Sequence, residues 1–185
     1  MEIERITIAE ADNEKYLRQI SKEVDFNDKS YLDDINKLEM FCVNNEVFAM
    51  AAVQIGIPKR IVYLKNTSED VNKNEDPSYN EAKVLINPKL VKIEGETEYW
   101  EACASCLDYM GLIKRPYRMV VKYQGVDGKR HVKTFKGFEA TVMSHELDHL
   151  DGVLHIDIAS EIIEMPKEER TEWRKEHPYK IISRD

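Results

Sequence analysis

One short run, HELDH at residues 145–149, constrains the fold of this chain more than any other feature of its sequence. Residues four apart on a helix share one face, so both imidazoles of this run can reach the same divalent ion. Val142 and Leu150 add an apolar side, which predicts that the helix is buried. We therefore expect an interior helix over residues 140–150, ended by Gly152, that carries a metal site.

Glu146 follows the first histidine, where its carboxylate can face a metal-bound water and take its proton. Such a site needs a third protein ligand besides the two histidines. The residues alone leave this ligand open. His155 completes the longer H-E-x-x-H-x-x-G-x-x-H spacing of zinc endopeptidases, whereas Cys103 and Cys106 lie in the segment WEACASCLD. Those peptidases carry a methionine turn well downstream, but here Met165 follows His155 almost at once.

The rest of the chain mixes strand-like and helical patterns without the regular alternation of a doubly wound fold. Polar residues predict a solvated loop at 66–80. The other expected elements are helices at about 29–45 and 167–176, a strand at 60–64, two strand-like runs over 83–100 broken at Asn87-Pro88, and a hairpin of residues 118–124 and 131–140 that turns at 125–128. This pattern predicts an α+β fold and one domain over residues 1–185.

Composition excludes several classes of protein. The net charge of −8 argues against specific nucleic-acid binding, because such proteins need positive charge to hold phosphates. No apolar stretch approaches the ~18 residues of a membrane span, and no signal peptide is recognisable at the N-terminus. Three cysteines are too few for a disulfide scaffold, so we expect a protein of the reducing cytoplasm.

Three segments together resemble the peptide deformylase family, in its order and spacing. Residues 47–54, VFAMAAVQ, are similar to its G-x-G-Φ-A-A-x-Q segment; residues 101–105, EACAS, are similar to E-G-C-L-S; and residues 145–149 match H-E-x-D-H. The resemblance extends from about Phe48 to Asp157. It implies mixed or antiparallel sheets packed around a central helix that bears the H-E-x-x-H motif, with N-terminal and C-terminal helices.

The resemblance implies a metal-dependent hydrolase that removes the N-formyl group from the N-terminal formylmethionine of newly made polypeptides and releases formate. Cys103, His145 and His149 would hold one divalent metal, typically ferrous iron (Fe2+), often replaced by Zn2+, Ni2+ or Co2+. Cys103 is preferred to Cys106 because this alignment keeps the Glu, Cys and Ser of the second motif. Metal-bound hydroxide would attack the formyl carbon, with Glu146 as the general acid and base.

The resemblance also implies roles for residues around the metal. Gln54 and the backbone N–H of Ala104 would stabilise the oxyanion, and Glu101 with Arg115 would support the ligands from behind. The methionine pocket would be lined by Phe48, Ala49, Tyr99, Phe138 and Val142. Ordinary core packing is an equally simple account of each pocket residue. Formylmethionyl peptides of nascent chains are the expected partners, with a transient ribosome contact.

Several positions depart from the family pattern. Val47, Ala49 and Ala102 replace glycines, and Ala104 replaces a leucine. Alanine in place of glycine is costly only where the backbone needs a positive φ or where a ligand approaches closely. The substitutions leave open a diverged protein that binds peptide N-termini without turnover. The C-x-x-C pair of Cys103 with Cys106 also suggests sensitivity to oxidation.

Overall fold

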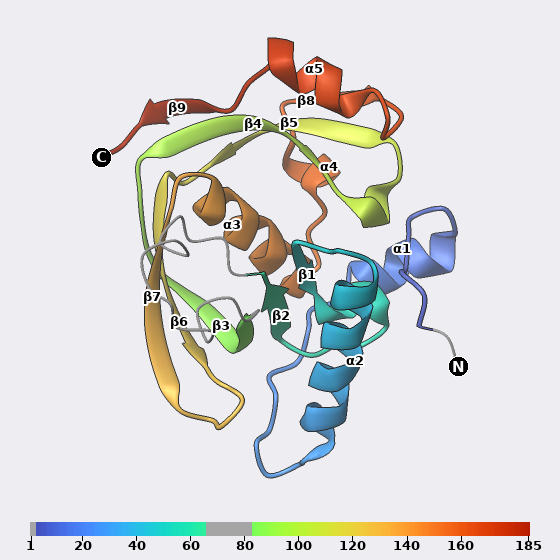
Figure 1. Cartoon of the computed structure of the whole chain (residues 1–185), viewed down its shortest axis with the longest axis vertical. Helices are drawn as coiled ribbons and strands as arrows, with labels where there is room; N and C mark the ends of the chain where they lie inside the picture. The colour runs from blue at the N-terminus through green and yellow to red at the C-terminus, as the bar shows by residue number, and fades with distance from the viewer. Residues whose placement is uncertain (1–2, 66–82) are drawn as a thin grey trace.

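Two antiparallel sheets form the frame of the structure, a computed structural model that describes residues 3–65 and 83–185 (Figure 1). The loop expected at residues 66–80 lies outside the described residues. The five-stranded sheet has the order β1-β2-β3-β6-β7, and the four-stranded sheet has the order β8-β5-β4-β9. The strands are β1 (Ala49–Ala51), β2 (Ile61–Leu64), β3 (Lys83–Glu94), β4 (Glu96–Ala102), β5 (Tyr109–Arg115), β6 (Arg118–Gln124), β7 (Arg130–Lys136), β8 (Glu161–Glu164) and β9 (Lys180–Ser183).

The helices lie around these sheets. They are α1 (Ala11–Leu17), α2 (Ser30–Asn44), α3 (Phe138–Leu150), α4 (His155–Ile158) and α5 (Arg170–Glu176), with the 3₁₀ helices η1 (Ala52–Ile55) and η4 (Ala104–Cys106). The predicted α+β class is confirmed, and the pairings between the named strands are antiparallel. None of the helices in the described part of the chain has the length and apolar character that crossing a membrane requires.

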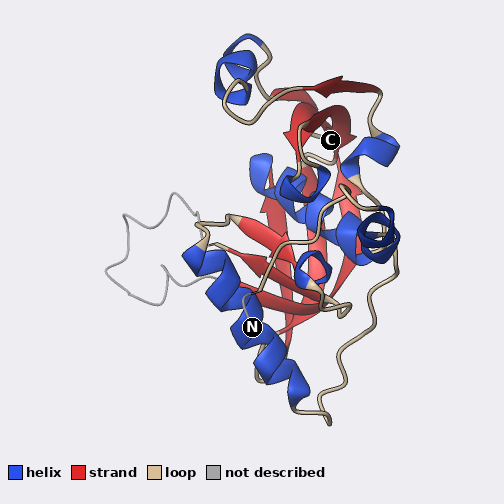
Figure 2. Ribbon diagram, turned by 90° about the vertical axis from the view of Figure 1, so that its right-hand side faces the viewer, coloured by secondary structure: helices blue, strands red, loops and turns tan. Residues whose placement is uncertain are grey.

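The five-stranded sheet is covered on both faces, which explains the uninterrupted apolar sequence of β2. Alternate residues of a strand point to opposite faces. Ile61 and Tyr63 pack with α2, whereas Val62 and Leu64 pack with α3. The two views show α2 along one side of the strands and α3 between this sheet and the four-stranded one (Figures 1 and 2). Burial of each large apolar side chain contributes about 1.5–3 kcal/mol to folding.

The break expected at Asn87-Pro88 was wrong, because β3 runs through both residues. Its register against β6 shifts between Ile86 and Lys89. Asn87 has a φ of 51° and turns its side-chain amide toward Val24, accepting that residue's N–H at 2.7 Å and donating to its carbonyl at 3.0 Å. A bulge of this kind places proline where the ladder needs no N–H, so the strand bends rather than ends.

The helix with the HELDH run begins at Phe138, two residues before the expected start, and ends at Leu150. Gly152 follows with a φ of +75°. A Cβ at this glycine would lie 2.3 Å from the carbonyl oxygen of Arg18, so no larger residue fits. The predicted glycine stop is therefore confirmed, and a close backbone approach adds to the reason for it.

The C-terminal segment contains a strand besides the predicted helix. Helix α5 begins at Arg170 rather than Lys167, and the last strand, β9, pairs with β4. Trp173 of α5 packs edge-on against Trp100 of β4, with ring centroids 6.0 Å apart. The segment is thus part of the four-stranded layer, as the upper part of Figure 1 shows.

Candidate metal centre and substrate cavity

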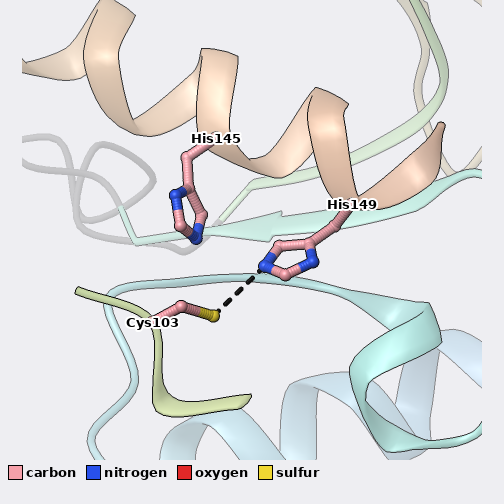
Figure 3. Close-up of side chains that lie close together, drawn as sticks. All are labelled: Cys103, His145 and His149. Atoms are coloured by element: carbon pink, nitrogen blue, oxygen red, sulfur yellow. Dashed lines mark hydrogen bonds between the residues drawn. The ribbon is translucent and has the colours of Figure 1, made fainter. Parts of the chain in front are cut away.

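Cys103, His145 and His149 converge on one point between α3 and the end of β4 (Figure 3). One ligand atom from each residue lies within 4.8 Å of the other two. The Sγ atom of Cys103 is 3.2 Å from Nε2 of His149. The i and i+4 spacing on α3 brings the imidazoles together, and their ring centroids are 4.9 Å apart.

Cys103 owes its position to the change from strand to 3₁₀ helix. Strand β4 ends at Ala102, and the Cys103 carbonyl accepts the Cys106 N–H at 3.0 Å in the first turn of η4. A hydrogen bond from the Cys106 thiol lowers the pKa of the Cys103 thiol well below its ordinary value, and the nearby His149 lowers it further. A thiolate with two imidazoles is a donor set that suits a borderline-soft divalent metal. The group fits a metal in its chemistry as well as in its geometry.

A buried ion pair supports His145 from behind. The Nδ1 atom of His145 is 2.9 Å from Glu101 Oε2, which leaves Nε2 of the ring to face the cluster. Arg115 holds the same carboxylate with two hydrogen bonds, of 2.7 and 2.9 Å, and also bonds Asp148. Burial alone would raise the pKa of Glu101, but the bonds from Arg115 and His145 outweigh it and lower the pKa to about 2. Glu101 therefore stays ionised and fixes the orientation of His145.

Glu146 lies beside the cluster and is 4% exposed. Its Oε2 atom is buried without a hydrogen-bond partner among the described residues. Burial raises the pKa of this carboxyl, although the neighbouring His145 and His149 oppose the change. A buried carboxyl group with a raised pKa and a free oxygen is suited to take and release a proton.

Gln54 is oriented toward the same point from η1. Its Oε1 atom accepts the Ala51 N–H at 3.1 Å, which directs Nε2 toward Ser105 Oγ at 3.0 Å and Cys103 Sγ at 3.5 Å. Ala104 is the first residue of η4, where a backbone N–H has no carbonyl of the same helix to bond. Both residues line the cavity beside the cluster, and each offers an N–H donor.

A cavity of about 230 Å³ opens beside these groups. All five residues predicted for the methionine pocket line it: Phe48, Ala49, Tyr99, Phe138 and Val142. The sequence prediction missed Thr141, which its position one turn before His145 could have indicated. It also missed Arg5 and Arg174, which line the cavity from the two ends of the chain and carry no motif.

The two rival ligands lie outside the cluster. His155 is buried, and its Nε2–H donates to the Tyr109 carbonyl at 3.2 Å, so this nitrogen is engaged elsewhere. Burial lowers the pKa of His155. The Cys106 thiol contacts Cys103, which together with burial raises the pKa of Cys106 and keeps it protonated. Both residues therefore lie next to the cluster but are not among its ligands.

The replaced glycines do not require glycine conformations. Positive φ among the non-glycine residues of the described chain occurs at Glu46, Asn87 and Leu107. Val47, Ala49 and Ala102 lie outside this set, so a Cβ at these positions causes no backbone strain. The departures from the family motifs are compatible with the folded backbone.

Comparisons with known proteins agree with this geometry. A model of the polypeptide deformylase family matches residues 6–164. Peptide deformylase 2 of Clostridium acetobutylicum is 35% identical over 166 residues, covering 88% of this chain and 99% of that protein.

Solved structures give the same result. A probable peptide deformylase of Synechococcus phage S-SSM7 aligns with a TM-score of 0.71 at 30% identity, over 84% of this chain and 99% of that one. The peptide deformylase of Thermotoga maritima aligns with a TM-score of 0.72 at 27% identity, over 87% of this chain and 99% of that one. A chain that matches over this length, and that brings the three motifs to one cavity, belongs to the peptide deformylase family.

Proposed function

We propose that this chain, acting as one catalytic domain over residues 1–185, removes the formyl group from the N-terminal formylmethionine of nascent polypeptides and releases formate. The observation that carries the proposal is the cavity whose inner end adjoins the cluster of Cys103, His145 and His149 and is lined by Glu146, whose Oε2 atom has no hydrogen-bond partner among the described residues. Membership of the family supports the reaction, and the donor set supports a metal-dependent mechanism. By resemblance to the family, we expect Fe2+. Zn2+, Ni2+ or Co2+ can substitute, since affinity for this donor set does not by itself select iron.

Cys103, His145 and His149 would hold the metal through one thiolate and two imidazoles. A metal in this position supplies a Lewis acid that lowers the pKa of a bound water toward neutrality. The Glu101 carboxylate keeps the His145 ring in its ligating orientation through Nδ1. Arg115 keeps that carboxylate ionised.

Glu146 would take the proton of the attacking water on its free Oε2 and deliver it to the departing amine. A positioned acid and base of this kind accelerates a reaction by roughly 10²–10⁴-fold. Gln54 Nε2 and the Ala104 N–H would donate to the oxygen of the formyl group as negative charge develops there. Each such donor is worth roughly 3 kcal/mol in the transition state.

The peptide main chain would pair with β1. This strand is at the edge of its sheet, and Ala49 lines the cavity. An extended peptide added to a free edge gains backbone hydrogen bonds without dependence on its sequence. The methionine side chain would then enter the apolar part of the cavity, between Phe48, Tyr99 and Val142.

The deciding experiment measures formate release from formyl-Met-Ala-Ser by protein loaded anaerobically with ferrous iron, and by its Glu146→Ala variant. We expect the variant to lose at least about a hundredfold in rate while it keeps an equimolar metal. A wild-type protein that holds metal but releases no formate would contradict the proposal, and it would favour the diverged peptide binder.

The zinc endopeptidase receives less support, because the Nε2 atom of His155 bonds a backbone carbonyl. Cleavage of internal peptide bonds that is lost in His155→Ala would support the endopeptidase function instead. Cytoplasmic location and a transient ribosome contact stay predictions.

A further inference from the structure

The outer wall of the cavity is built by residues beyond the part of the chain that matches the family. The match ends at residue 164, yet Arg174 of α5 lines the cavity. Tyr179, just before β9, packs edge-on against Tyr99 and Phe138, with centroids 5.8 and 5.7 Å apart. A segment outside the family-model match therefore lines the cavity.

The guanidinium of Arg174 lies over the Tyr99 ring, and not all of its N–H donors are bonded. Its guanidinium lies 5.3 Å from the centroid of the Tyr99 ring, and Nη2 donates to the Trp100 carbonyl at 3.3 Å. The Nε atom is buried and has no hydrogen-bond partner among the described residues. No acidic residue of the described chain forms an ion pair with it. A half-buried guanidinium that lines a cavity and has no ion-pair partner can bind a carboxylate through its outer nitrogens.

A second arginine faces the cavity from the N-terminal segment. The Arg5 guanidinium lies 5.4 Å from the centroid of the Phe41 ring, and its Nε atom is also buried without a partner among the described residues. The two acidic side chains of the cavity do not neutralise these charges, because Glu101 bonds Arg115 and His145, and Glu146 lies beside the metal ligands. In this protein of net charge −8, the cavity is thus lined by two arginines that form no ion pair with any described residue.

The strand that carries the metal ligand indicates which part of a peptide would reach Arg174. Tyr99 and Cys103 are four residues apart along β4 and its continuation. That separation is about 13 Å in an extended chain. In an extended peptide with its formyl group at the metal end, the third side chain points the same way as the methionine. It would therefore meet the wall formed by Tyr99 and Arg174.

We propose that Arg174, assisted by Arg5, is a specificity-determining residue that favours formylmethionyl peptides with a carboxylate side chain at the third position. The inference rests on the proposed deformylase function. It adds to that function a preference among nascent chains, set by residues at the two ends of this protein.

The test compares formyl-Met-Ala-Asp-amide with formyl-Met-Ala-Asn-amide on the iron-loaded protein. The two peptides have the same shape, differ only in charge, and lack a terminal carboxylate that could bind instead. We expect kcat/KM for the aspartate peptide to be about fivefold higher at low salt and the ratio to fall toward one near 1 M salt. Aspartate at the second position should give a smaller ratio, since that side chain points away.

Variants assign the preference to its residues. Arg174→Gln should reduce the aspartate-to-asparagine ratio below about twofold, and Arg5→Gln should reduce it less. Lys175→Gln is the matched control, because it removes the same charge from the next, exposed residue of α5, which is paired with Glu172. Each ratio is measured within one protein, so a general loss of activity does not affect it.

A second measurement does not depend on turnover. Binding of both peptides to the Glu146→Ala variant, measured as Kd, should show the same fivefold preference. Equal kcat/KM and equal Kd for the two peptides, or a full preference in Arg174→Gln, would overturn the inference. If no formate is released from either peptide, the deformylase proposal fails, and the Kd ratio alone decides whether the carboxylate site exists.

Discussion

The two ends of the cavity are built in different ways. At the inner end, Glu101 and Arg115 are buried and bonded to each other, and the hydrogen bond that Nδ1–H of His145 donates to Glu101 leaves the His145 ring with one orientation. At the outer end, the rings of Tyr99 and Tyr179 meet edge-on, and Arg174 is half-buried with an Nε atom that bonds no described residue. The residues of the inner end lie in sequence motifs with fixed spacing. The outer end is lined by Arg5, near the N-terminus, and Arg174, near the C-terminus. Substitutions at the outer end can therefore alter substrate recognition without altering the metal ligands.

The largest effect should separate Cys103 from Cys106. If the inner end is a metal centre, Cys103→Ser should abolish metal binding at equimolar metal, since a hydroxyl is a much weaker ligand than a thiolate. Cys106→Ser should keep its metal, because its thiol only donates to Cys103. Metal content after gel filtration gives the answer, and loss of metal in Cys106→Ser alone would reverse the assignment.

The same comparison can be made on the histidines. His149→Ala should lose the metal, whereas His155→Ala should retain it, because the His155 ring bonds the Tyr109 carbonyl. Retention of metal by His149→Ala would show that His149 is not a ligand.

A smaller effect is expected behind the ligands. Arg115→Leu leaves Glu101 buried without its ion pair, which should lower the free energy of unfolding by about 3–5 kcal/mol and weaken metal binding by roughly 10–100-fold. Urea unfolding and metal titration measure the two effects. Lys114→Leu, at the neighbouring residue exposed on the same strand, is the control and should change neither by much. Equal effects of both substitutions would mean that the buried pair contributes nothing special.

The smallest effect should appear at the outer wall. Tyr179→Ala removes two edge-on ring contacts, each worth about 0.5–1.5 kcal/mol, and so should raise KM for formyl-Met-Ala-Ser several-fold with little change in kcat. Ile181→Ala, at an exposed position of β9, is the matched control. A fall in kcat without a change in KM would place Tyr179 in the chemistry rather than in recognition.

Local patterns determined much of the fold. The HELDH helix, the Gly125–Gly128 hairpin and the buried β2 are each encoded by residues close together in the chain, whose periodicity and turn residues act at short range. The continuation of β3 through Asn87-Pro88 was missed, because the partner of the Asn87 side chain, Val24, is 63 residues away. The last strand was missed for a similar reason, since β9 is stabilised by pairing with β4.

In the candidate site too, some residues were predictable from the sequence and others were not. The sequence alone determined the residues that the fold brings together at the inner end, since motif spacing fixes which side chains share a helix face or follow a strand. The family resemblance had already implied that Glu101 and Arg115 support the ligands. Only the tertiary structure decided that His145 is the ligand they orient and that Arg5 and Arg174 line one cavity. Residues at opposite ends of a chain are not related by any local period. Their meeting depends on how the sheets and α5 pack, which no short stretch of sequence contains.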